Sequence, residues 1–113
     1  MTCVTTAHLT VEEQRTGTDV VLRLAGEIDM ATAGELRAAT TSSMTSPPER
    51  VVLDFAGVSF CDSQGLSTLI SLNRDISAAG STLVLSNVGD FMGRLLEITG
   101  LRAAFTVEDT SPA

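Results

Sequence analysis

The run VVLDFAGVSF, residues 51–60, constrains the fold of this chain more than any other feature. Nearly all of it is apolar, and this composition is typical of a strand that is covered on both faces, as in a parallel sheet. A helical pattern begins directly after Asp62 and Ser63, so the strand ends in a sharp turn into a helix. The chain is therefore expected to contain parallel βα units.

Strand and helix patterns alternate along the rest of the chain. Strands are predicted over residues 3–13, 19–29, 51–60, 81–88 and 104–109, and helices over 31–44, 64–80 and 90–100. Gly17 can adopt the positive φ of a tight turn, so the first two strands are expected to form a hairpin. This order predicts an α/β fold with a mixed, mostly parallel sheet, about four helices and an opening β-hairpin.

Each predicted helix has end signals and an apolar face. Asp29 and Asp90 stand at the N-cap positions of the first and third helices, and Gly80 and Gly100 follow the second and third. In the first helix a modest buried stripe is predicted, formed by Ala33, Leu36, Thr40 and Met44. In the second helix the residues at helical spacing are Leu66, Leu69, Ile70, Asn73 and Ile76, and in the third Phe91, Leu95 and Ile98 lie on one side.

The charge of the chain narrows the classes of partner. Its 113 residues carry a net charge of −7, with a pI of about 4.4, and all seven basic residues are arginine. Scattered arginines form no basic face, so nucleic acid and anionic membranes are not expected partners. A partner with a basic patch would be attracted, and the like charges of two copies favour a monomer.

Length and the first residues predict the organisation and location of the chain. We expect a single domain over residues 1–113, with an ordered core at about 4–108 and a tail at 109–113. No signal segment is recognisable at the N-terminus and no apolar run could span a bilayer, so a cytoplasmic location is expected. Cys3 and Cys61 are expected to be free thiols.

Two loops carry the candidate functional residues: GEID at 26–29 and CDSQG at 61–65. If the strands that precede them are parallel neighbours, Asp29, Asp62 and Ser63 converge at one edge of the sheet. Each loop also opens a helix, where free backbone N–H groups and the helix dipole favour negative charge.

Asp62 and Ser63 are both typical N-cap residues, so capping alone could explain them. Gly65, however, stands in the first turn of the helix, where glycine costs about 1 kcal/mol relative to alanine. A cap gives no reason for that cost, whereas the close approach of another backbone or of a reactive group would. From spacing alone, both a structural cap and a presented hydroxyl group remain open for this pair.

Enzymatic roles for these residues lack the required companions. A hydrolase nucleophile at Ser63 would need glycine in place of Cys61 and a histidine base, and the single histidine, His8, is predicted to be a half-buried strand residue. A receiver-like phosphoacceptor at Asp54 would need an acidic pair and a lysine, and the chain has no lysine. Asp54 is instead expected to bond with neighbouring loop backbone.

Redox and metal chemistry are equally poorly supported. Cys61 follows an apolar strand and lacks a second cysteine or a histidine nearby, so a buried and unreactive thiol is expected. Glu27, Asp29 and Asp62 could contact a divalent cation, but no phosphate-binding loop accompanies them. No metal or cofactor is therefore predicted.

Four segments together carry a family resemblance: LAGEID at 24–29, VVLDFAGVSFCDSQGL at 51–66, AGSTLVL at 79–85 and LLEITGLRAAF at 95–105. With these motifs, nearly the whole chain resembles a STAS domain of the anti-sigma factor antagonist family. The resemblance implies a bacterial regulatory protein that is a substrate and a binding partner and not an enzyme.

The resemblance also implies roles for the residues of the two loops. Ser63 would be phosphorylated by a partner anti-sigma factor that is itself a serine kinase, and a serine phosphatase would reset it. The unphosphorylated form would bind the anti-sigma factor and so release the sigma factor. The residues expected on the partner-binding surface are Glu27, Asp29, Asp62, Gln64, Gly65 and Leu66.

Gln64 departs from the family pattern, in which the residue after the phosphorylated serine is usually small. It places a longer amide in the expected interface and leaves Ser59 and Ser67 as the nearest other acceptors. The alternative function is a constitutive STAS scaffold or ligand-binding module in which Ser63 is never modified.

Overall fold

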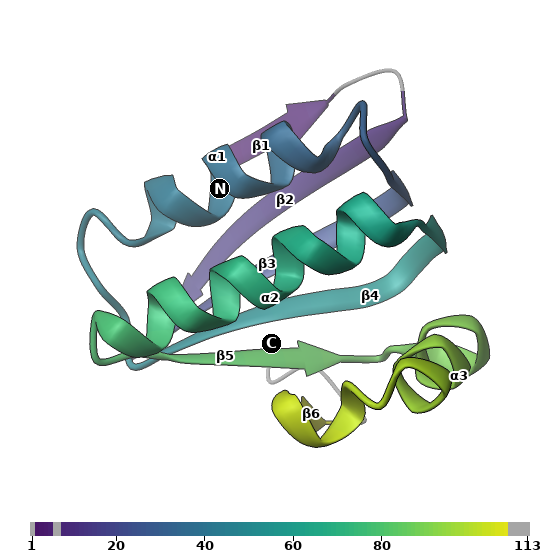
Figure 1. The fold of residues 1–113 in the computed structure, drawn as a ribbon. Coiled ribbons are helices and arrows are strands. Elements are labelled where there is room, and N and C mark those ends of the chain that lie inside the picture. The colour runs from purple at the N-terminus through teal and green to yellow at the C-terminus, as the bar shows by residue number, and fades with distance from the viewer. Residues whose placement is uncertain (1, 6–7, 109–113) are drawn as a thin grey trace.

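The computed structural model describes residues 2–5 and 8–108, with side chains from residue 8 onward, and builds them around one sheet (Figure 1). Within these residues the sheet has six strands in the order β1-β2-β3-β4-β5-β6, so each strand pairs with the next one in the chain. The strands are Thr2–Thr5, Leu9–Thr16, Asp19–Ile28, Arg50–Cys61, Thr82–Ser86 and Thr106–Glu108. The first three are antiparallel and the last four run parallel, which confirms the predicted mixed sheet.

The opening hairpin joins β2 to β3 through Gly17 and Thr18. Gly17 has a φ of 59°, which suits the tight connection between twisted strands and costs glycine little. The prediction of a single strand over 3–13 is wrong, since this segment forms two paired strands, β1 and β2. The break between them leaves no signal in the sequence, because the β-branched pattern continues across it. The predicted hairpin is confirmed, and the predicted tail at 109–113 lies outside the described residues.

The helices of residues 8–108 are α1 (Ala33–Ser43), α2 (Ser63–Ala78), α3 (Gly89–Thr99) and the short 3₁₀ helix η1 (Arg102–Ala104). The three α-helices are fewer than the expected number of about four, since η1 is a 3₁₀ helix of only three residues. Each α-helix begins and ends within two residues of its predicted range. In Figure 1, α1 and α2 lie side by side on one face of the sheet, whereas α3 lies beyond the end of β5.

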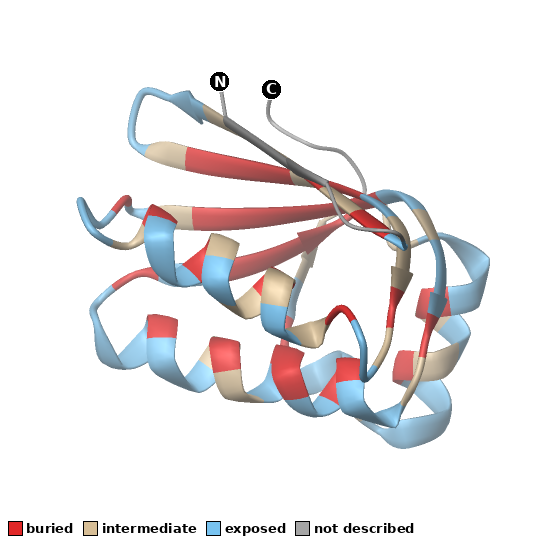
Figure 2. Ribbon diagram, turned by 90° about the horizontal axis from the view of Figure 1, so that it is seen from above, coloured by how far each residue is buried: buried red, intermediate tan, exposed pale blue. Residues whose placement is uncertain are grey.

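The main core lies between the sheet and its helices, and Figure 2 colours the buried parts of these elements red. Leu53 of β4, Leu36 of α1 and Leu69 of α2 are fully buried there, and burial of one such side chain is worth about 1.5–3 kcal/mol. Val52 and Val84 belong to a second buried cluster, on the opposite face of the sheet. The first half of β4 is therefore covered on both faces, as predicted.

The second half of β4 does not follow that prediction. β5 pairs with β4 only over residues 50–54, whereas residues 57–61 continue beside β3. Ser59 and Phe60 are consequently exposed. An apolar run reports a tendency to be buried, but the length of the neighbouring strand decides how much of it is covered.

The predicted faces of α1 and α2 are largely confirmed. Leu36 and Thr40 of α1 are buried, and α2 buries Leu66, Leu69, Leu72 and Ile76. Ile70 is an error of the prediction, since 43% of it is exposed and Leu72 takes the buried position instead.

The apolar row that the sequence places on one side of α3 is not the row that the fold buries. The helix buries Met92 and Leu96, whereas Phe91 and Ile98 are exposed and Leu95 is half-buried. Both rows have helical spacing, so periodicity alone could not choose between them. The choice is made by the position of α3 at the end of the sheet, where it is covered on one side.

The helix ends are mostly as predicted. Gly80 and Gly100 have φ values of 88° and 73°, the left-handed conformation expected after a helix. Asp90 is not the N-cap of α3, because the helix begins at Gly89 and its cap position is Val88, which makes no side-chain cap bond. Asp90 instead lies in the first turn, where the helix dipole stabilises its negative charge.

Candidate functional site

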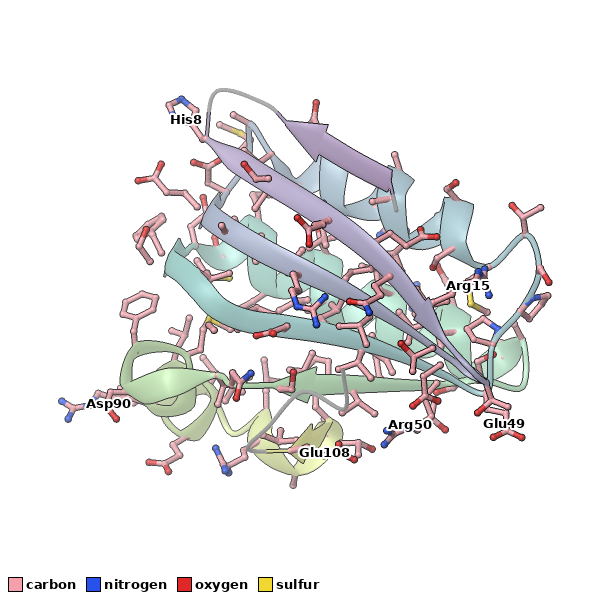
Figure 3. All side chains as sticks on the ribbon, turned by 180° about the vertical axis from the view of Figure 1, so that it is seen from behind. His8, Arg15, Glu49, Arg50, Asp90 and Glu108 are labelled. Atoms are coloured by element: carbon pink, nitrogen blue, oxygen red, sulfur yellow. The ribbon has the colours of Figure 1, made fainter. Side chains whose placement is uncertain are left out.

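The carboxyl ends of β3 and β4 bring the two predicted loops together. Ile28 and Cys61 are partners in the parallel register, and the N–H group of Asp62 donates to the carbonyl oxygen of Ile28 at 3.1 Å. Asp29 and Asp62 therefore follow neighbouring strand ends, as predicted. Figure 3 shows His8 at the same edge of the sheet.

Asp62 is the N-cap of α2 and determines how Ser63 is presented. Its Oδ1 accepts a hydrogen bond from the N–H group of Gly65 at 2.9 Å, which confirms the predicted cap. Ser63 is the first helical residue and is exposed, and its hydroxyl group has no hydrogen-bond partner among the described residues. The cap thus holds the backbone beneath Ser63 and leaves the hydroxyl group accessible.

Glycine is required at position 65 because the first turn of α2 lies close to the backbone of β3. This contact explains why the helix carries a residue of low helix propensity there. A Cβ atom at this position would lie 2.8 Å from the carbonyl oxygen of Ile28 and 2.7 Å from Sγ of Cys61, closer than packing allows. Gly65 and Leu66 are both buried, so they support the loop from within. The exposed residues of the CDSQG segment are Ser63 and Gln64.

Gln64 stands beside Ser63 in the first turn of α2. Its backbone carbonyl oxygen accepts a hydrogen bond from the hydroxyl group of Thr68 at 2.9 Å. The side chain of Gln64 is exposed. A partner that reached the hydroxyl group of Ser63 would therefore meet the amide of Gln64 at the same surface.

Asp29 organises the neighbouring loop, although it is not the N-cap of α1. The cap position is Thr32, and Oδ1 of Asp29 accepts hydrogen bonds from the N–H groups of Ala31 at 2.9 Å and Thr32 at 3.1 Å. The hydroxyl group of Thr32 donates to the carbonyl oxygen of Glu27 at 2.8 Å. The prediction placed the cap three residues early because an aspartate that closes a turn looks like a cap in sequence.

His8 lies at this edge just before β2, and its predicted environment is wrong. It precedes the strand, and 57% of its side chain is exposed, so it is not a half-buried strand residue. Its Nδ1 lies 3.8 Å from Oε1 of Glu27, and its carbonyl oxygen accepts the N–H group of Glu27 at 2.8 Å. Gly26 has a φ of 115°, and any Cβ there would collide with the carbonyl group of His8. No pattern in the sequence links these two segments.

Cys61 lies beneath the exposed loop and is a buried thiol, as predicted. It is 3% exposed, and burial raises its pKa to about 12, with the charge of Asp62 adding to the effect. A thiol with this pKa is almost entirely protonated at neutral pH and is a poor nucleophile. In the part of the chain with described side chains, no three His, Cys, Asp or Glu residues cluster closely enough to hold a metal ion.

Asp54 has a structural role, although its partners are a backbone N–H group of its own strand and a loop side chain and not the predicted loop backbone. It is 7% exposed, and its Oδ1 accepts hydrogen bonds from the N–H group of Ala56 at 2.9 Å and from Nδ2 of Asn87 at 3.1 Å. Asn87 has a φ of 52° in the turn before α3. Asp54 therefore fixes the path of the chain between β5 and α3.

Comparison with known families agrees with this architecture. One family model, described as Mlab, STAS domain, matches residues 11–107. SpoIIAA, the Bacillus cell fate determinant, has a structure in its phosphorylated form that shares this fold, with a TM-score of 0.70 and 23% identity over 90% of this chain and 92% of that one. The fold and the matched residues define this chain as a STAS domain.

Relatives with higher sequence identity indicate which group of STAS domains the chain belongs to. An anti-sigma-B factor antagonist from Listeria monocytogenes is 32% identical over 95 residues, 83% of each chain. The crystal structure of an anti-sigma factor antagonist from Mycobacterium paratuberculosis has a TM-score of 0.75 and 27% identity, over 90% of this chain and 86% of that one. The chain belongs to the STAS-domain family of anti-sigma factor antagonists.

Across residues 2–5 and 8–108, none of the helices is both long enough and apolar enough to cross a membrane.

Proposed function

We propose that this protein is an anti-sigma factor antagonist that is controlled at Ser63. Its unphosphorylated form binds a serine-kinase anti-sigma factor, which then releases its sigma factor in the cytoplasm. The kinase activity of that partner phosphorylates Ser63 and ends the complex, and a serine phosphatase restores the binding form. The observation that carries the proposal is the exposed hydroxyl group of Ser63 on a helix N-terminus that Asp62 holds in place.

Electrostatics explain how one phosphate could act as a switch without unfolding the domain. A phosphoserine carries a charge of about −1.5 to −2 at neutral pH. At the first position of α2 that charge is favoured by the helix dipole, so the fold should tolerate it. Toward a partner, the same charge is added beside Asp62 and near Asp29, on a surface that is already acidic.

The partner surface that we propose is formed by exposed or half-exposed groups around Ser63. Glu27, Asp29, Asp62 and Gln64 supply it, whereas Gly65 and Leu66 support it from below. A partner that contacts a neutral hydroxyl group here would have to desolvate a charged phosphate after modification. Burying an unpaired charge costs several kcal/mol, which is enough to dissociate a moderately tight complex.

The proposal can be tested with a panel of purified serine-kinase anti-sigma factors from the source organism. Each kinase is incubated with the protein and ATP, and intact mass with peptide mapping locates any phosphate. Modification at Ser63, absent in Ser63→Ala and retained in Ser59→Ala and Ser67→Ala, is expected. Calorimetry should then show that Ser63→Asp binds the same kinase at least tenfold more weakly than the wild type.

The constitutive alternative makes the opposite prediction. If the wild type, the Ser63→Ala variant and the phosphorylated protein all bind the partner equally well, the switch is wrong and a scaffold role is the better account. Intact mass of the protein from its native cells gives an independent check, because a regulated Ser63 should be phosphorylated under at least one growth condition.

A further inference from the structure

Helix α3 has two apolar rows, and the fold buries one of them. Met92 and Leu96 lie in the core, but Phe91 is 47% exposed and Ile98 is 76% exposed. Leu95 lies between these two at helical spacing and is half-buried. An exposed row of this kind costs solubility, and on a small domain it commonly marks a contact surface.

Phe60 extends this row from α3 to the end of β4. It is 42% exposed, and its ring packs against that of Phe91 with centroids 6.2 Å apart and an angle of 28° between the ring planes. We name Phe60, Phe91, Leu95 and Ile98 the α3 patch. A hollow of about 350 Å³ lies on it, lined by Asp90, Phe91, Arg94, Leu95 and Ile98.

The α3 patch begins at the same strand end that leads to Ser63. Phe60 lies at the end of β4, two positions before Asp62, and its ring contacts the ring of Phe91. Figure 3 shows Asp90, at the start of α3, on the same edge of the sheet as His8. Met30, 77% exposed in the loop after β3, adds another apolar side chain at this edge.

Charge distinguishes the occupants that could cover this surface. The edge carries the carboxylates of Glu27, Asp29, Asp62 and Asp90, which outnumber the guanidinium group of Arg94 in the hollow, and the chain has a net charge of −7. A second copy would bring the same acidic groups against them, which opposes association. A different protein with basic side chains around an apolar segment would complement both the charge and the patch.

We propose that the anti-sigma factor that recognises Ser63 also covers the α3 patch, with an apolar segment flanked by basic side chains. This inference rests on the function proposed above and adds a second contact to it. The patch supplies the affinity, because aromatic side chains at the centre of an interface contribute most to binding. Ser63 supplies the control, because a phosphate there changes the charge next to the patch and not the patch itself.

The test uses the full chain and the kinase from the panel that modifies Ser63. Phe91→Ala and Ile98→Ser truncate the patch, and Glu97→Ala is the matched control, an exposed residue of the same helix outside the patch. In the unphosphorylated state, both patch variants should bind the kinase at least tenfold more weakly than the wild type by calorimetry. The KM for Ser63 phosphorylation should rise by a similar factor with kcat unchanged, since the lost contact is the same in ground and transition states.

Circular dichroism and urea unfolding of every variant separate lost binding from lost folding. Ile98 is exposed enough for Ile98→Ser to remain folded, so it decides the matter if Phe91→Ala is unstable. Wild-type affinity in a folded Ile98→Ser and Phe91→Ala pair overturns the proposal and leaves the Ser63 switch standing. A wild-type chain that dimerises through the patch in sedimentation, with partner binding intact in the variants, overturns it as well. If no kinase of the panel binds or modifies the wild type, the proposed function itself fails, and the patch proposal with it.

Discussion

Gly65 is the residue on which the geometry of the candidate site depends most directly. It allows the first turn of α2 to lie against the end of β3, and a Cβ atom would meet both Ile28 and Cys61. We expect Gly65→Ala to lower the free energy of unfolding by about 1–3 kcal/mol, because the main-chain contact cannot relax as a flexible side chain would. Urea denaturation measures this change.

Gly34→Ala provides the matched control for that substitution. Gly34 is also helical, but nothing lies within 4 Å of a Cβ at its position. Alanine should therefore raise the free energy of unfolding there by about 0.5–1 kcal/mol. Equal effects at the two glycines would contradict the role that we assign to Gly65.

We expect the buried thiol of Cys61 to make the protein lose stability at alkaline pH. Its pKa is raised from an ordinary 9.0 to about 12 in the folded state, so between these values the unfolded chain alone loses the thiol proton. Ionisation of this thiol therefore costs no stability below about pH 9. Between about pH 9 and about pH 12 the free energy of unfolding falls by about 1.4 kcal/mol for each pH unit. The chain contains no lysine and no tyrosine, so few other groups titrate in this range.

The measurement is urea unfolding at about pH 8 and about pH 10.5 in a Cys3→Ser background. With Cys61 present, stability should fall between the two conditions, and Cys61→Ala should remove most of that fall. A slope that is unchanged in Cys61→Ala would show that another group is responsible.

At the scale of single elements, the N-terminus of α2 is held by one side-chain hydrogen bond. Asp62→Ala removes the acceptor for the N–H group of Gly65 and should cost about 1 kcal/mol of stability. Asp62→Asn keeps an acceptor oxygen without the charge, so its thermal unfolding should resemble that of the wild type. If Asn and Ala destabilise equally, the charge and not the hydrogen bond stabilises this helix.

Most elements could be predicted from sequence because their signals are local. Alternation, helical spacing and the glycines at 80 and 100 are each contained in a short window, and so is the pair of Asp62 and Ser63. The exposed row of α3 could not be predicted, since two rows have equal spacing and tertiary position selects one. The contact of Phe60 with Phe91, and of His8 with Glu27, joins distant segments and leaves no local pattern.

For the molecule as a whole, Arg50 connects three strands on the face opposite α1 and α2. Its Nη2 lies 3.0 Å from Oδ2 of Asp19 in β3, and its Nη1 lies 2.7 Å from Oε2 of Glu108 in β6. The hydrogen bond with Asp19 and both carboxylate charges raise the pKa of Arg50 above its ordinary value. The short strand β6 is thereby tied to β4 across β5.

We expect Arg50→Ala to lower the free energy of unfolding by about 1 kcal/mol at low ionic strength and by less at high salt, because these pairs are partly exposed. Arg74→Ala serves as the control, since Arg74 is 3.9 Å from Asp75 and highly exposed, and should change little. Urea unfolding at two salt concentrations gives both numbers. A loss at Arg50 that does not depend on salt would indicate packing of its aliphatic stem instead.

The order of strands in the sheet, identical to their order in the chain, has a consequence for synthesis. Each strand can pair as it leaves the ribosome with the strand made just before it, so the sheet can grow from one edge without waiting for a distant segment. β4 and α2, which carry Phe60 and Ser63, are completed before α3 exists. The nascent chain therefore displays the residue that we propose is switched before it acquires most of the surface that we propose holds the partner.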